Sequence, residues 1–191
     1  MRDREEFEQK LALWTRIQDG TASPEDHGLA MAWGDQHRID ALKNAGPIDK
    51  WMMTTGVKLM QAWPFPAIEG KSAQFTYEQI LLFAILYGKS DIENGGLQQF
   101  FGNHTGDCAL ETVQGLESVK AFEASRVLRD AMSLFGAPYP RERTRRCDKL
   151  PSLLNELAVL TDSFYDSLPP KKDFDAACEY LLQNARETGE S

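Results

Sequence analysis

The stretch ENGGLQQFFGNHTGD, residues 93–107, decides the fold because it joins segments with helical patterns on both sides. Asn-Gly indicates a β-hairpin only between alternating strands, so a hairpin is excluded here. Nucleotide-binding glycine loops need GxGxxG or GxxxxGK[ST] after a strand, and this stretch has neither pattern. We therefore predict a short helix that forms a joint between two other helices.

The composition of this predicted joint suits a bend between packed helices. Gly95 and Gly96 lack side chains, so the backbone of a neighbouring helix can approach closely. Gly102 is expected to end the helix in a left-handed turn, and Asp107 to cap the next helix. Apolar burial comes from Leu97, Phe100 and Phe101, and open backbone groups are satisfied by Asn94, Gln98, Gln99 and Asn103.

The flanking segments extend the helical pattern in both directions. Upstream, residues 76–79 (TYEQ) form a capping box before the apolar run 80–87, which predicts a buried central helix. Downstream, an apolar stripe at helical spacing predicts a helix that ends at Pro169-Pro170. A last helix is expected over about 173–184. The stripe consists of Leu153, Leu157, Leu160, Phe164 and Leu168, and the last helix carries Phe174, Cys178, Tyr180 and Leu181.

The amino-terminal third also has a helical pattern. Ser23-Pro24 starts a helix expected to run to about Asn44, and Pro47 opens the next one. Two prolines and a glycine make residues 63–74 a loop. We predict an all-α protein, a compact multi-helix domain over 76–186 with an amino-terminal helical extension over 1–63.

Composition limits the function classes. The 191 residues carry a net charge of −8 and a pI of about 4.9, so the basic surface needed to bind nucleic acid directly is absent. No run is apolar enough for a membrane helix, and the charged start lacks a secretory signal. Cys108, Cys147 and Cys178 are odd in number and widely spaced, which argues against disulfides and a zinc site. We expect a cytoplasmic protein with neither cofactor nor metal.

The motif also carries a family resemblance. It is similar to the signature of a bacterial family, long catalogued as a domain of unknown function, that includes the DNA-mimic proteins. The resemblance covers about residues 76–184. It implies an all-helical fold whose carboxylates imitate the phosphates of duplex DNA and so occupy a DNA-binding protein. The matching residues are Asn94, Gly95, Gly96, Gln99, Phe100, Phe101, Asn103, Gly106 and Asp107.

Charge is concentrated where such mimicry would need it. Residues 151–191 hold 8 acidic and 3 basic residues, a net charge of −5. We expect a protein partner with a basic surface, such as a DNA-binding protein. The basic run 141–146 is interpreted as a solvated loop that pairs with nearby acids. The predicted partner-binding residues are Glu156, Asp162, Asp166, Asp173, Asp175 and Glu179, with a second patch at Asp3, Glu5, Glu6 and Glu8.

Two other hypotheses stay open beside mimicry. The first is an enzyme in which His104, next to Asn103 and Asp107, acts as a general base, although no partner nucleophile is evident. The second is a generic helical interaction module or homodimer. Its surface would come from the four tryptophans of the amino-terminal third, which the spacing favours as core. These are Trp14, Trp33, Trp51 and Trp63.

Overall fold

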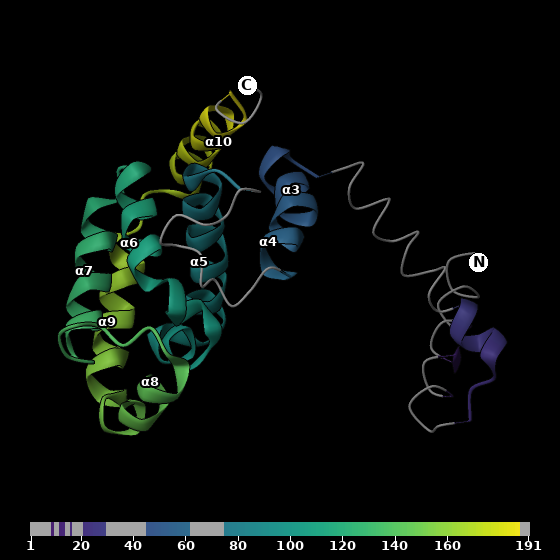
Figure 1. Cartoon of the computed structure of the whole chain (residues 1–191), viewed down its shortest axis with the longest axis horizontal. Helices are drawn as coiled ribbons and strands as arrows, with labels where there is room; N and C mark the ends of the chain where they lie inside the picture. The colour runs from purple at the N-terminus through teal and green to yellow at the C-terminus, as the bar shows by residue number, and fades with distance from the viewer. Residues whose placement is uncertain are drawn as a thin grey trace. The chain divides into compact units, whose positions relative to one another are not determined.

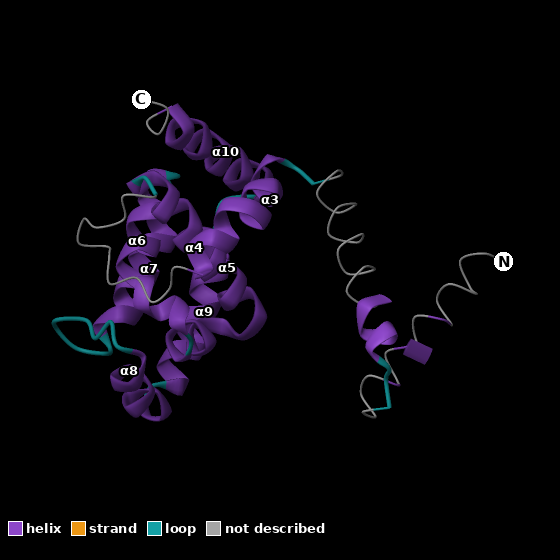
Figure 2. Ribbon diagram, turned by 45° about the vertical axis from the view of Figure 1, so that its right-hand side comes forward, coloured by secondary structure: helices purple, strands orange, loops and turns teal. Residues whose placement is uncertain are grey.

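The computed structural model describes residues 9, 12–13, 16, 21–29, 45–61 and 75–187. The chain forms two compact units, Met1–Lys50 and Trp51–Ser191 (Figure 1). Every regular segment in the described ranges is a helix and none is a strand, which confirms the all-α prediction (Figure 2). The loop predicted over residues 63–74, the end of the helix expected at Asn44 and three of the four tryptophans lie outside the described ranges.

The described amino-terminal segments begin where the sequence predicts. Helical residues 24–29 start with a reciprocal cap, in which Asp26 N donates to Ser23 Oγ at 3.1 Å and Ser23 N donates to Asp26 Oδ2 at 3.0 Å. Hydrogen bonds from Arg16 and Ser23 lower the pKa of Asp26 to about 2. Pro47 opens α3 (Pro47–Trp51), and Trp51 is buried as expected. A π-helical turn, η1 (Met52–Gly56), and α4 (Val57–Gln61) follow.

The central helix α5 (Tyr77–Gly102) starts at the predicted capping box. Gln79 N donates to Thr76 Oγ1 at 3.3 Å, and Thr76 N donates to Gln79 Oε1 at 3.0 Å. All side chains of residues 80–85 are buried, so this turn and a half is enclosed on every face. An apolar run of this kind is typical of a helix that is covered all round.

The joint differs from the predicted short helix. The helix α5 continues through it with a kink at Gly95 and Gly96, where Gly96 has a φ of 72°. The expected close approach of a helix backbone is also wrong, because a Cβ on Gly96 would meet the Thr161 side chain at 3.1 Å. The close backbone approach occurs at Gly115, whose added Cβ would lie 2.9 Å from the Leu81 carbonyl oxygen.

Two other details of the joint are corrected. Gly102 does not end α5 in a left-handed turn, since the cap is Asn103 with a φ of −97°. Asp107 does not cap the next helix, because it lies inside a 3-10 turn, η2 (His104–Cys108), and α6 has no side-chain cap. Instead, Asp107 bonds with Arg146 and His104, as described below.

The helices that follow α5 cover it in two layers (Figure 1). Helices α6, α8, α9 and α10 contact α5 directly, whereas α7 packs on α6 and α9. The predicted stripe is confirmed in part, because Leu157 and Phe164 of α9 are buried, whereas Leu153, Leu160 and Leu168 are half-buried. In α10, Phe174 and Cys178 are buried, but Tyr180 is 67% exposed and is not core. The bounds are α6 Ala109–Ser118, α7 Phe122–Ser133, α8 Arg143–Lys149, η3 Leu150–Ser152, α9 Leu154–Ser167 and α10 Lys171–Glu187.

Candidate functional site

The predicted acidic residues of α9 lie on its solvent face. Glu156, Asp162 and Asp166 are all exposed, while Leu157 and Phe164 on the opposite face are buried. Asp162 and Asp166 are one turn apart, about 6 Å along the helix axis. Val159 is 67% exposed, so the solvent side of α9 also carries an apolar side chain.

The kink of α5 adds a carboxylate that the sequence analysis missed. The Tyr165 hydroxyl of α9 donates to the Ile92 carbonyl, next to the exposed Glu93. Burial raises the pKa of Tyr165, and the negative charges of Glu93 and Asp162 raise it further. Glu93 pairs with Lys89 on its own helix, and its side chain is 52% exposed. We define the acidic face as Glu93, Glu156, Asp162 and Asp166.

The acids of α10 are in a different electrostatic setting. Asp173 is exposed, whereas Asp175 and Glu179 are half-buried. Asp175 pairs with Lys171 at 2.5 Å, and Lys172 is also exposed on the first turn. The first turn of α10 therefore holds as many cations as carboxylates, so the strongest negative charge lies on α9.

The motif residues gather around a carboxylate that was not predicted as part of the motif. Asp91 accepts hydrogen bonds from Gln99 Nε2 at 3.0 Å, from Asn103 Nδ2 at 3.1 Å and from the Thr105 hydroxyl. Gln99 and Asn103, which were expected to satisfy open backbone groups of the joint, thus bind the Asp91 carboxylate. The Leu97 amide donates to Thr161 Oγ1 at 3.0 Å. No local pattern marks Asp91, because its partners lie 8, 12 and 14 residues further along the chain.

The prediction of a solvated loop over the basic run 141–146 is wrong for its carboxyl-terminal part. Residues 143–149 form α8, and the Arg146 side chain is completely buried. Its guanidinium donates to the Phe101 and Asn103 carbonyls at 2.9 Å each and to Asp107 Oδ1 at 2.5 Å. It also donates to the Pro140 and Arg141 carbonyls. Arg146 therefore ties the carboxyl end of α5 to the loop before α8.

Two neighbouring arginines add to this attachment. Arg143 Nε donates to the Gly102 carbonyl at 2.6 Å, which is one of the last open carbonyls of α5. Arg141 binds both oxygens of Glu111 at 2.8 and 2.9 Å, and Glu111 is only 2% exposed. We call Arg141, Arg143 and Arg146 the arginine clamp. The sequence signal that was missed is that these arginines follow the proline-containing segment 138–140.

The side chains of the loop 103–107, which one hypothesis made catalytic, form hydrogen bonds within the fold. His104 Nδ1 lies 3.1 Å from Asp107 Oδ2, while the other carboxylate oxygen of Asp107 binds Arg146. The His104 side chain is 62% exposed. Cys108 is buried, and burial strongly raises the pKa of its thiol, so a thiolate nucleophile is disfavoured there. Asn103 is turned towards Asp91.

The described residues were also compared with the requirements of a metal site and of a membrane-spanning helix. Among them, no group of three or more histidine, cysteine, aspartate or glutamate side chains is arranged to hold a metal ion. None of the described helices is both long and apolar enough to cross a membrane.

Comparisons with known proteins agree with the motif. A family model described as DMP19-like protein matches residues 73–184, which include the kinked helix, the clamp and the acidic face. Comparisons with curated proteins and with solved structures returned no match. Because the model covers more than half of the chain and describes the DNA-mimic family that the motif resembles, this chain belongs to the DMP19-like family of DNA-mimic proteins.

Proposed function

We propose that this protein is a non-catalytic DNA mimic that acts in the cytoplasm. Its acidic face would occupy the nucleic-acid-binding surface of a basic protein, such as a transcription regulator. The observation that carries the proposal is the exposure of Glu156, Asp162 and Asp166 on one helix, whose Tyr165 donates to the Ile92 carbonyl, next to Glu93. Membership of a DNA-mimic family supports the same role.

The spacing of the carboxylates supports imitation of one DNA strand. Glu156 and Asp166 are ten residues apart, about 15 Å along the helix axis. One DNA strand has a phosphate every 3.4 Å or so, and therefore about four or five phosphates over that length. α9 thus offers three carboxylates over the length of about four or five phosphates, so its acidic side would be a sparse copy of the strand. The partner is expected to bind duplex DNA more tightly than this protein.

The test is capture of DNA-binding proteins from the host lysate, with and without excess duplex DNA. The proposal expects a basic protein to be retained and the DNA to displace it. Asp162→Lys combined with Asp166→Lys should abolish retention, because both changes fall on the acidic face. Glu25→Lys combined with Asp49→Lys changes the net charge equally in the amino-terminal segments and should retain the partner.

Salt dependence separates this proposal from an apolar interaction module. The Debye length falls from about 10 Å at 0.1 M salt to about 3 Å at 1 M, so a charge-based complex should dissociate. Apolar docking on Val159 and Tyr180, both 67% exposed, should survive high salt. A partner that stays bound at 1 M salt and is not displaced by DNA would exclude mimicry.

A further inference from the structure

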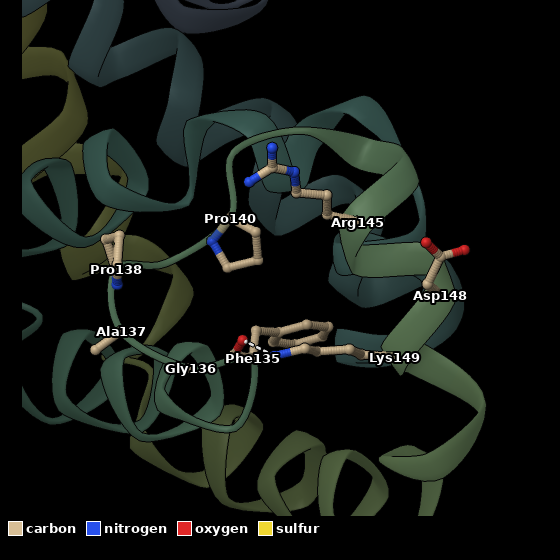
Figure 3. A pocket seen from close by; sticks show the side chains of 8 residues that line it. All are labelled: Phe135, Gly136, Ala137, Pro138, Pro140, Arg145, Asp148 and Lys149. Atoms are coloured by element: carbon tan, nitrogen blue, oxygen red, sulfur yellow. Dashed lines mark hydrogen bonds between the residues drawn. The ribbon is translucent and has the colours of Figure 1, made fainter.

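A hollow lies between α8 and the loop that precedes it, separate from the acidic face (Figure 3). Its volume is about 380 Å³, within the range of roughly 300–1,000 Å³ that is usual for small-molecule sites. One wall is the loop with Ala137, Pro138 and Pro140, and the other is α8 with Arg145 and Lys149 (Figure 3). Phe135, which is 1% exposed, forms its floor.

The walls of the hollow are fixed by contacts outside it. Lys149 Nζ donates to the Phe135 carbonyl at 2.6 Å, which joins α8 to the start of the loop. The Phe135 ring packs on Phe101 of α5 at a centroid distance of 4.7 Å. Further along the loop, the Tyr139 hydroxyl donates to the Gly106 carbonyl at 2.8 Å. The loop is therefore attached at both ends, and a ligand would meet a preformed site.

The chemistry of the walls selects a class of ligand. Arg145 and Lys149 place two cations on the α8 side, where Asp148 lines the hollow and Glu142 pairs with Arg145 at its edge. Pro138 and Pro140 place two apolar rings on the loop side (Figure 3). We propose that this hollow binds a small organic acid, which is attracted by the cations Arg145 and Lys149 and has a flat apolar body against the two prolines.

Both cations have donors to offer such a ligand. The Lys149 ammonium has three donors, and the bond to the Phe135 carbonyl uses one of them. Arg145 pairs with Glu142 through Nε at 2.9 Å. This ion pair is 71% and 69% exposed, and such pairs are weak, so it does not hold Arg145 away from an anion.

The test is an NMR titration of the full ¹⁵N-labelled chain at constant ionic strength with three probes. Benzoate combines an anion with a flat ring, benzamide is its neutral counterpart, and inorganic phosphate is an anion without an apolar body. Benzoate is expected to shift the amide signals of Gly136, Ala137 and Lys149 in a saturable way. Benzamide and phosphate should bind at least about tenfold more weakly, because each lacks one of the two interactions.

Substitutions assign the binding to this hollow. Arg145→Gln and Lys149→Met should each weaken benzoate binding about tenfold, since each removes one of the two cations that attract the carboxylate. Arg145→Gln disturbs only an exposed ion pair, so it decides the matter if Lys149→Met misfolds. Lys172→Met, at an exposed lysine of α10, is the matched control and should bind normally. Equal binding of benzoate and benzamide, phosphate binding as tight as that of benzoate, or normal binding by Arg145→Gln would each overturn the proposal.

Discussion

Replacement of Arg146 by methionine should destabilise the second unit more than any other change to the arginine clamp. Arg146 is completely buried and donates to four carbonyls and one carboxylate. Methionine fills a similar volume but has no donor. The change therefore leaves the Phe101 carbonyl and the mostly buried Asp107 carboxylate without their cation.

The expected cost follows from the burial of these partners. Removal of one member of a buried ion pair costs about 3–5 kcal/mol, because the other charge stays buried without a partner. Asp107 keeps 21% side-chain exposure and can regain some hydration, which places the estimate near the middle, at about 4 kcal/mol. Domains are stable by only about 5–15 kcal/mol. The loss should lower the melting temperature by about 8–16 °C for a chain of this size.

Thermal unfolding followed by circular dichroism at 222 nm measures this shift. Arg145→Met is the matched control, because Arg145 is the adjacent residue and makes an exposed ion pair with Glu142. The control should change the free energy of unfolding by less than about 0.5 kcal/mol. If Arg146→Met costs less than about 1 kcal/mol, the hydrogen bonds of Arg146 are not what holds α8 to the end of α5.

Three further predictions concern the kink and the thiols. Thr161→Val keeps the shape of the side chain but leaves the buried Leu97 amide without an acceptor. Urea unfolding should therefore show a free energy of unfolding lower by about 1–3 kcal/mol. Thr161→Ser keeps the acceptor and should avoid this loss. Gly96→Ala places a Cβ at a φ of 72° and 3.1 Å from Thr161 Oγ1, and the same assay should show a loss of about 1–3 kcal/mol. Burial raises the pKa of the Cys178 thiol to about 12, so at pH 8 iodoacetamide should label Cys147, which is half-buried, well before Cys178.

The raised thiol pKa also gives a pH dependence with a defined sign. An unfolded cysteine loses its proton near pH 8.5, while the folded Cys178 keeps it up to about pH 12. The unfolded state therefore binds fewer protons over this range, and the contribution of Cys178 to stability falls as the pH rises through it. Cys178→Ala should reduce that fall in a urea series from pH 8 to 10. Equal labelling rates for Cys147 and Cys178 in the folded protein would contradict the burial on which both statements rest.

Features with local causes were predicted well from the sequence. The capping box at Thr76 and Gln79 needs only residues three apart, and the structure has both of its hydrogen bonds. The apolar stripe of α9 likewise depends on helical periodicity alone, and Leu157 and Phe164 are buried as expected. Such patterns repeat within one element, so their outcome does not depend on the rest of the fold.

Features that join distant segments were missed or misread. Arg146 belongs to a basic run that is typical of a solvated loop, yet its partners Phe101 and Asn103 lie 45 and 43 residues earlier in the chain. The role of Asp107 was misread for the same reason, since a carboxylate before a helix usually caps it. Only the folded chain shows that Arg146 binds this carboxylate instead.

The sequence by itself determined that this chain is helical, where its central helix begins and which motif links it to a DNA-mimic family, because each depends on neighbouring residues. Only the tertiary structure decided that Thr161 accepts the hydrogen bond of the Leu97 amide at the kink and that Asp91 accepts those of the Gln99 and Asn103 side chains. It also decided that Arg146 binds the Phe101 carbonyl at the end of α5. It also joined Tyr165 of α9 to the Ile92 carbonyl, next to Glu93. The physical reason is that a buried polar group must find a partner, and here that partner comes from a distant part of the chain.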